Sequence, residues 1–451
     1  MPRKRWIALA LVVAGAGAFW WWSREEPADT RFNGAYRLES GELAILTPRR
    51  GAILRYRALD GESHALWPAG ERTYEMGAGF SDRRPVIATV RFAASSGGAS
   101  AEGFTLRAEG GAQIEARRLD LPERTLSFRS GDLALRARVV LPRGKGPFPA
   151  IVAVQGSGDR SAVDTSYLPY LFASHGIAAM VYDKRGTGGS EGEYTQNFHV
   201  LAGDVGAAVE RLRSIPEIRA NDVHLAGFSQ GGWIAPMAAK RLGDVRSLLI
   251  GYGPMVTVAE EDRWGYVHAL RKAGFGEDAI RKADRVDAVI GSILDHGEDR
   301  WDELGERLEE AEGEAWFEAV KGSDSLLGFL ADTWLPLPAV RLWQWYRTRG
   351  EVPFIDRLYD PVPTVAALEA PSLWILGGED HSMPTGWTID ELEKLQEAGR
   401  PIRIRVYPEA DHGILLFEET QSGRRYLGYP PDYFPTMVDW VRRESGLEAA
   451  P

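Results

Sequence analysis

The chain has 451 residues, no cysteine and a formal net charge of −11 at pH 7. The excess of acidic residues argues against nucleic-acid binding, because such proteins present basic surfaces. Without cysteine the chain has no disulfide, no thiolate metal site and no cysteine nucleophile. A hydrophobic content of 44% is ordinary for a globular protein, and the length predicts two or three domains.

The first 23 residues predict an export or membrane segment. Arg3, Lys4 and Arg5 precede an uncharged apolar run over residues 6–22, close to the short limit of ~17 residues for a spanning helix. Tryptophans at both ends of the run favour an uncleaved membrane anchor. Small residues at positions 14–18 instead favour a cleaved signal peptide. Both interpretations predict that the rest of the chain is exported, facing the periplasm or the cell exterior.

A polar linker over residues 24–32 and a β-rich domain over residues 33–121 are expected next. Short apolar runs alternate there with turn signals, which is typical of a small antiparallel β domain. The expected strands are residues 42–47, 51–58, 85–92, 104–108 and 113–116. No group of residues in this domain indicates a catalytic site.

Strands then alternate with helices, which predicts a doubly wound, mostly parallel α/β sheet formed by residues 122–253 and 360–451. Nearly continuous apolar runs suit parallel strands that are buried on both faces. After a hairpin at 125–141, these runs are residues 150–154, 178–182, 223–228, 247–250 and 372–376. Residues 402–407 are expected to be the last strand, and residues 433–443 a closing helix.

Residues 254–359 interrupt this alternation and predict a helical cap insertion. Helices are expected at residues 277–294, 301–312 and 334–346. The cap contains six tryptophans, at positions 264, 301, 316, 334, 343 and 345. We expect most of them to hold the insertion together, although an aromatic-rich cap is also suited to line an apolar substrate pocket.

A candidate nucleophile, Ser229, lies in the sequence Gly227-Phe228-Ser229-Gln230-Gly231, between a predicted strand and a predicted helix. A G-x-S-x-G turn at such a junction needs small residues beside the serine, because strand and helix pack closely there. The turn exposes the serine hydroxyl and directs the next backbone N–H toward the same space. The placement predicts Ser229 as a nucleophile and the N–H of Gln230 as an oxyanion donor.

A serine nucleophile needs a base within hydrogen-bond reach and a third group that orients the base. In the arrangement with a nucleophile elbow the order along the chain is serine, acid, histidine. His412 follows the strand at 402–407 and is the predicted base, whereas His381 comes too early and the other downstream histidines fall in the insertion. Asp380, in the turn after the strand at 372–376, is the predicted acid, with Glu379 as its competitor.

The second oxyanion donor is expected from the loop after the strand at 150–154. This loop reads Gln155-Gly156-Ser157-Gly158, and its glycines allow the backbone to approach a ligand closely. The N–H of Ser157 is the predicted donor, with Gly156 as the alternative.

Together these segments resemble the α/β-hydrolase fold. They are most similar to bacterial serine esterases grouped with dienelactone-hydrolase-like and prolyl-oligopeptidase-like enzymes. Residues 155–158, 182–190 and 227–232 carry the resemblance, which implies Ser229 as nucleophile, Asp380 as acid and His412 as base. One departure is Gln155, where the family usually has histidine. Glutamine is still able to hydrogen-bond the loop, so we expect a changed mouth of the site.

The resemblance also covers the segment Asp183-Lys184-Arg185, which follows the strand at 178–182. We expect these three residues to brace the loop after their strand. An alternative role for Arg185 is to bind a substrate carboxylate.

These observations predict a serine hydrolase that cleaves carboxylic ester bonds through an acyl-enzyme. A serine peptidase and an acyl thioesterase or acyltransferase would use the same triad, and a catalytically inert binding or scaffold protein is the alternative of another class. The expected partner is a small ester or acyl substrate, with the N-terminal segment meeting a membrane. No cofactor, metal or nucleic acid is expected.

Overall fold

The computed structural model describes residues 28–93, 101–332, 355–421 and 423–448. The chain divides into two compact units, the first formed by Met1–Ala58 and Ser63–Leu119 and the second by Leu59–Glu62 and Asp120–Pro451. The expected anchor or signal segment, residues 1–23, lies outside the described residues. Within the described part of the chain, no helix combines the length and the apolar character needed to cross a membrane.

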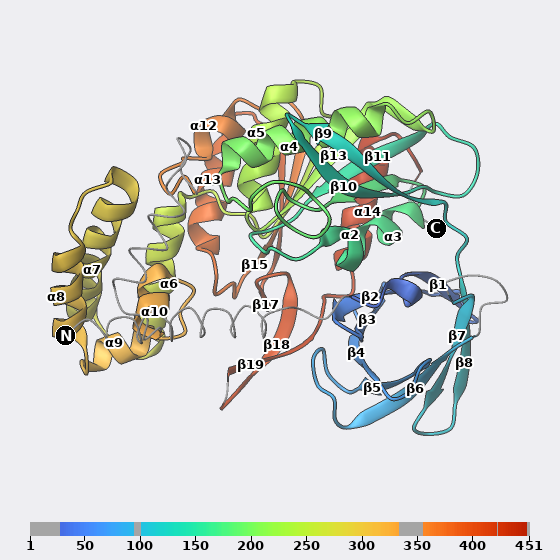
Figure 1. Cartoon of the computed structure of the whole chain (residues 1–451), viewed down its shortest axis with the longest axis horizontal. Helices are drawn as coiled ribbons and strands as arrows, with labels where there is room; N and C mark the ends of the chain where they lie inside the picture. Colours follow the sequence, from blue (N-terminus) through green and yellow to red (C-terminus); the bar gives the residue numbers. More distant parts are fainter. Residues whose placement is uncertain (1–27, 94–100, 333–354, 422, 449–451) are drawn as a thin grey trace, which may run out of the picture. The chain divides into compact units, whose positions relative to one another are not determined.

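The first unit is a closed antiparallel barrel of eight strands (Figure 1). Its strands are β1 (Gly34–Leu38), β2 (Leu43–Arg50), β3 (Ile53–Ala58), β4 (Ser63–Pro68), β5 (Thr73–Gly77), β6 (Val86–Phe92), β7 (Gly103–Ala108) and β8 (Gln113–Arg118). Pairing of β1 with β8 closes the barrel. The sequence indicated antiparallel strands but neither this closure nor β1, β4 and β5, which are short and include glycine, charged residues or, in β4, proline.

Aromatic side chains fill the barrel. Phe92 stacks on Phe32 with ring centroids 4.0 Å apart and meets Tyr74 and Phe104 edge-on at 5.6 and 5.8 Å. Phe32 ends the short helix η1 (Thr30–Phe32) and is 3% exposed. The end of the expected linker, residues 24–32, is therefore part of the barrel, because burial of this aromatic ring fixes it there.

The second unit contains an eight-stranded sheet in the order β16-β15-β14-β13-β11-β12-β10-β9. Its strands are β9 (Glu123–Ser130), β10 (Leu133–Val140), β11 (Phe148–Val154), β12 (Ala178–Tyr182), β13 (Ile218–Phe228), β14 (Leu248–Gly251), β15 (Ser372–Gly377) and β16 (Ile402–Tyr407). β10 runs antiparallel to both of its neighbours and the other pairs are parallel. This topology confirms the predicted α/β-hydrolase fold.

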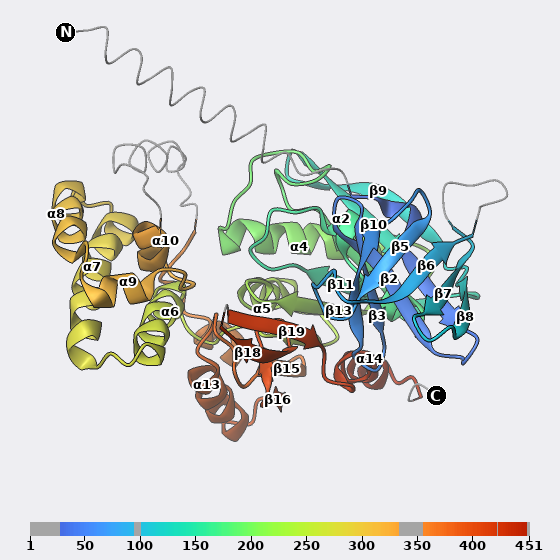
Figure 2. The same ribbon diagram turned by 90° about the horizontal axis from the view of Figure 1, so that it is seen from below.

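Helices cover both faces of this sheet, α4 and α5 on one face and α3 and α14 on the other (Figures 1 and 2). The helices around the sheet are α2 (Ala162–Thr165), α3 (Leu168–Ala173), α4 (Phe198–Arg213), α5 (Gly231–Leu242), α12 (Val362–Ala366), α13 (Thr385–Glu397) and α14 (Tyr433–Glu444). The main core joins the apolar faces of α4 and α5 to β13, with Leu225 and Ile234 almost inaccessible.

Three strands follow the expected last strand at 402–407, so that expectation was wrong. β17 (Ala410–Asp411), β18 (Leu415–Thr420) and β19 (Gly423–Gly428) form a separate antiparallel sheet. β18 and β19 carry mostly exposed or half-exposed residues, and for this reason the apolar pattern that marks a buried strand is missing.

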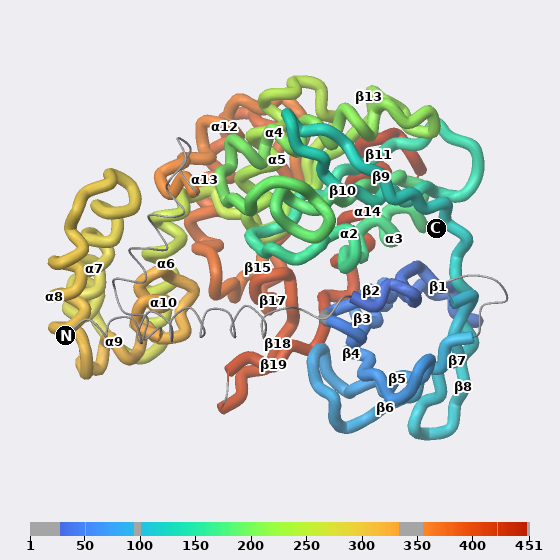
Figure 3. The backbone as a smooth tube through the Cα atoms, in the orientation of Figure 1, coloured from blue at the N-terminus to red at the C-terminus, as the bar shows by residue number. Residues whose placement is uncertain are grey.

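The cap insertion begins with five helices that form a bundle with its own core (Figure 3). They are α6 (Val258–Lys272), α7 (Glu277–His296), α8 (Trp301–Ala311), α9 (Ala315–Val320) and α10 (Leu326–Asp332). Trp316 is buried in this core and Trp301 packs against it, which agrees with a structural role. The expected helix at 334–346 and its three tryptophans lie outside the described residues.

The aromatic packing of the barrel generates a stability prediction. Phe92→Ala removes a ring that is 2% exposed and should lower the free energy of unfolding by about 3–5 kcal/mol. Arg91→Ala alters the neighbouring, exposed position of β6 and should change the free energy of unfolding by less than ~0.5 kcal/mol. Denaturant unfolding of the full chain measures both, and equal losses in the two variants would contradict the packing described here.

Candidate active site

Ser229 occupies the turn between β13 and α5 with a positive φ of 53°. A Cβ atom on Gly227 would lie 2.2 Å from the carbonyl oxygen of Gly231, and one on Gly231 would lie 2.4 Å from that of Val154. Only glycine fits at these two positions. The N–H of Ser229 donates to the carbonyl of Gly251 over 3.0 Å. Packing and this hydrogen bond therefore hold the serine in a conformation that side-chain-bearing residues rarely adopt.

The structure brings three of the predicted site residues into one chain of contacts. Nε2 of His412 lies 3.1 Å from Oγ of Ser229. Nδ1 of the same ring lies 2.9 Å from Oδ2 and 3.1 Å from Oδ1 of Asp380. The competing carboxylate of Glu379 is 61% exposed and its nearest ion-pair partner is Arg424, at 4.0 Å. Asp380 therefore occupies the position of the acid in this arrangement.

The turn after β15 fixes the carboxylate of Asp380. Its Oδ1 accepts hydrogen bonds from the N–H groups of Ser382 and Met383, at 2.8 and 3.0 Å. Its side chain is inaccessible to solvent. A buried carboxylate needs such donors because burial without them carries a large free-energy cost. The backbone N–H groups after β15 thus orient the carboxylate of Asp380, and this carboxylate orients the imidazole of His412.

Opposing effects act on the pKa of the His412 imidazole. Burial is the largest single effect and lowers this pKa, but the charge and hydrogen bond of Asp380 and the charges of Asp411 and Asp324 together outweigh it, so the net shift is upward. The ring of Tyr252, which also has a positive φ, meets the imidazole edge-on with centroids 4.8 Å apart. Sequence reasoning missed Tyr252, although it directly follows β14 at the same edge of the sheet.

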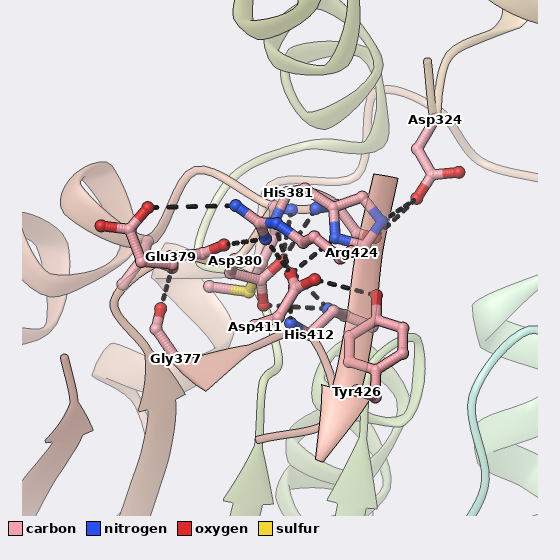
Figure 4. A network of polar contacts seen from close by, with 12 residues as sticks. Asp324, Gly377, Glu379, Asp380, His381, Asp411, His412, Arg424 and Tyr426 are labelled. Carbon is pink, nitrogen blue, oxygen red and sulfur yellow. Dashed lines mark hydrogen bonds and ion pairs between the residues drawn. The ribbon is translucent and has the colours of Figure 1, made fainter. Parts of the chain in front are cut away.

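A second carboxylate, that of Asp411, fixes the loop that carries the histidine (Figure 4). It accepts from the N–H of His412 at 2.7 Å and from the hydroxyl of Tyr426 at 2.9 Å. It also pairs with Nδ1 of His381 at 2.6 Å and with the guanidinium of Arg424 at 2.8 Å. Burial alone would raise the pKa of Asp411, yet the bonds from His381 and Arg424 bring it well below its ordinary value.

These contacts tie His412 to the β18–β19 hairpin, on which Arg424 and Tyr426 lie. Sequence reasoning assigned no role to Asp411, and the only signal that could have indicated one is its place directly before His412. His381 is engaged with Asp411 and, at 3.5 Å, with Asp324 of the cap. It is therefore part of this network, a role that its early position in the chain, which only argued against it as the base, did not predict.

The two backbone N–H groups predicted as oxyanion donors lie beside the nucleophile, and among the described residues neither has an acceptor. Neither the N–H of Gln230 nor that of Ser157 donates to any described group. A Cβ atom on Gly156 would lie 3.2 Å from Cβ and 3.6 Å from Oγ of Ser229. The loop after β11 therefore borders the serine closely enough to present an N–H to a bound carbonyl oxygen.

The loop differs from expectation at Gln155. Its amide nitrogen is buried and finds no hydrogen-bond partner in the part of the chain that the structure describes. Glutamine therefore does not brace the loop through this nitrogen. Arg185 does brace its own loop, because it forms two hydrogen bonds, of 2.9 and 2.6 Å, to the buried carboxylate of Asp204 on α4. The guanidinium of Arg185 is therefore already paired with a carboxylate of the protein, which argues against its alternative role of binding a substrate carboxylate.

Metal ligands do not gather around these residues. Across the described ranges, no group of three or more His, Cys, Asp or Glu side chains is arranged to hold a metal ion.

Comparison with known proteins places the chain in a family. A model of the X-Pro dipeptidyl-peptidase (S15) family matches residues 131–408. A comparison with curated proteins gives no match. Similar solved structures include a Pyrococcus furiosus esterase, with 13% identity, a TM-score of 0.44 and coverage of 72% of this chain and 92% of the esterase.

Two further structures are similar at the same level. An alpha/beta hydrolase from Penicillium has 17% identity and a TM-score of 0.43, covering 72% of this chain and all of its own. An acylaminoacyl peptidase from Pyrococcus horikoshii has 15% identity and a TM-score of 0.43, covering 87% of this chain and 54% of its own. The family match extends over more than half of the residues, and the chain therefore belongs to the X-Pro dipeptidyl-peptidase (S15) family.

Proposed function

We propose that this serine hydrolase cleaves carboxylic ester bonds through an acyl-enzyme, with Ser229 as nucleophile, His412 as base and Asp380 as the acid that orients the base. The observation that carries the proposal is the unbroken series of contacts from the buried Asp380 through His412 to Oγ of Ser229. Such a series activates a hydroxyl that is a weak nucleophile on its own.

In the first step a bond forms between Oγ of Ser229 and the acyl carbon, and Nε2 of His412 takes the hydroxyl proton. The N–H groups of Gln230 and Ser157 stabilise the oxyanion, since both lie beside the serine and are free among the described residues. The carbon–oxygen bond to the leaving group then breaks, and His412 returns its proton to the departing alcohol. Water attacks the acyl-enzyme with His412 again as base, which releases the acid and restores Ser229.

A serine peptidase is the second candidate, and the match to an X-Pro dipeptidyl-peptidase family favours it. The same atoms would act, with an amine in place of the alcohol as leaving group. The experiment that decides is a comparison of kcat/KM on p-nitrophenyl acetate and butyrate with kcat/KM on Ala-Pro-p-nitroanilide. The ester proposal fails if the dipeptide anilide is the better substrate.

We also propose that residues 1–23 export the enzyme, as a membrane anchor or as a cleaved signal peptide. The basic start and apolar run support this proposal. Cell fractionation followed by N-terminal sequencing of the mature chain distinguishes anchor, cleaved signal and absence of export.

Ser229→Ala removes the nucleophile and should lower kcat by roughly a million-fold, as knock-out of a triad serine does in other serine hydrolases. The variant should also lose labelling by a fluorophosphonate probe, because the probe bonds covalently to the serine oxygen. Steady-state assays and mass spectrometry of the labelled peptide measure the two effects. Wild-type protein that resists the probe and hydrolyses none of the three substrates would favour the inert binding protein.

The raised pKa of His412 predicts where activity is lost on acidification. The base acts only when neutral, so activity falls as the pH drops through the pKa of the imidazole, and the acid limb of kcat/KM should lie above the ordinary 6.5. Asp411→Asn removes one of the charges that raise this pKa and should move the limb to lower pH. Glu379→Gln removes an exposed charge and serves as the control, with no shift. A wild-type limb at or below 6.5 contradicts the electrostatics described here.

A further inference from the structure

A buried ammonium group lies behind the loop that borders the nucleophile. Lys184 lies two residues after the end of β12 and is 2% exposed. Its Nζ donates to the carbonyl oxygen of Gly156 over 2.6 Å and to Oε1 of Gln230 over 3.4 Å, and it lies 5.3 Å from the ring centre of Tyr194. Within the described residues no carboxylate forms an ion pair with it. The ammonium therefore makes its hydrogen bonds to two residues of the oxyanion region, Gly156 and Gln230.

The bond to Gly156 acts on the neighbouring N–H through the peptide group. The carbonyl of Gly156 and the N–H of Ser157 belong to one planar trans peptide, so they point in opposite directions. A cation on the oxygen draws electrons from the nitrogen and strengthens the N–H as a donor, as in other hydrogen-bond chains. It also fixes the plane of the peptide, and with it the direction of the N–H.

We propose that Lys184 is a positioning residue of the oxyanion site, whose ammonium holds and polarises the Gly156–Ser157 peptide while it ties down the side chain of Gln230. The inference rests on the proposed function, because it assigns Ser157 and Gln230 the role of oxyanion donors. It applies to any acyl substrate, since the oxyanion forms from esters and amides alike.

The residue directly before Lys184 is fixed, which makes the ammonium of Lys184 a preorganised charge. The fully buried carboxylate of Asp183 accepts from the hydroxyl of Ser161 at 2.8 Å and from the N–H groups of Val163 and Gly189 at 3.0 Å. Little reorganisation is then needed when negative charge develops on the substrate, which is the condition for effective electrostatic stabilisation.

Burial opposes the charge on this lysine. It lowers the pKa of Lys184 to about 8, although Asp159 partly offsets the effect. A buried lysine without a carboxylate partner weakens stability rather than adding to it. Its place against the two donor residues gives a physical reason for this arrangement, because functional sites are where such unfavourable charges are found.

Lys184→Met tests the proposal, because methionine keeps most of the side chain's shape and leaves no counter-ion stranded. We expect kcat to fall on the order of tenfold or more, less than the ~100- to 1,000-fold loss that removal of a whole donor causes, with KM changed by less than about threefold. A trifluoromethyl ketone, whose adduct with serine carries an oxyanion, should lose affinity by the same factor as kcat.

Arg185→Met is the matched control, since it removes the neighbouring cation, which has no bond to the oxyanion loop. It should lower stability while leaving kcat per folded molecule and ketone affinity within about twofold of wild type. Equal kcat losses in the two variants, or an unchanged kcat in Lys184→Met, overturn the inference.

A measurement on the wild-type enzyme keeps the test independent of folding. The groups that face Lys184 are Asp159, Tyr194 and Gln230. Loss of the proton from Lys184 should make kcat/KM fall above pH about 8, and this alkaline limb should be absent from Lys184→Met. A wild-type kcat/KM that stays flat to about pH 10, where an ordinary lysine titrates, overturns the inference alone. Wild-type protein inactive on all substrates overturns the proposed function instead.

Discussion

The close packing of β13, α5 and β11 around Ser229 is the constraint on which the candidate site depends. Glycines at positions 227 and 231 allow strand and helix to approach within distances that exclude a Cβ atom. Gly232 does the same toward Gly253, where a Cβ atom would lie 2.5 Å from the other glycine's Cα. A non-glycine residue at positive φ carries a strain of about 1–3 kcal/mol. The buried sheet on both sides of the turn supplies the packing that holds Ser229 there.

Two buried carboxylates then divide the control of His412 between them. Asp380 bonds the imidazole itself and sets its orientation, while Asp411 bonds the backbone N–H of the same residue and sets the position of the loop. Different groups stabilise the buried negative charge of each carboxylate. Backbone N–H groups bond Asp380, whereas the side chains of His381, Arg424 and Tyr426 bond Asp411. The ring and the loop of the histidine are thus fixed by independent groups, and the hairpin that holds Arg424 becomes part of the site's support.

The features that could be predicted from the sequence are those that depend on short, local sequence patterns. Ser229 was found from a five-residue turn, and Asp380 and His412 from their places just after apolar strands in the expected order. Closure of the barrel depends on the pairing of β1 with β8 and is not visible in any one strand. The contacts of Asp411 with Arg424 and of Lys184 with Gly156 join exposed or loop segments whose composition carries no periodic signal. They became visible only when the chain was folded, because long-range polar contacts depend on tertiary geometry.

In the mechanism proposed above, the charges around Ser229 match the charge separation that the reaction would create. When Oγ attacks a carbonyl, negative charge appears at the acyl oxygen and positive charge on His412. The carboxylates of Asp380 and Asp411 lie on the histidine's side of this pair and favour the imidazolium. The ammonium of Lys184 lies behind the loop and the glutamine on the oxyanion's side. All three groups are buried and fixed by neighbours before substrate arrives. For the proposed reaction these charges form a preorganised field whose direction agrees with the transition state, and in a site of low polarity such a field lowers a barrier more than mobile water does.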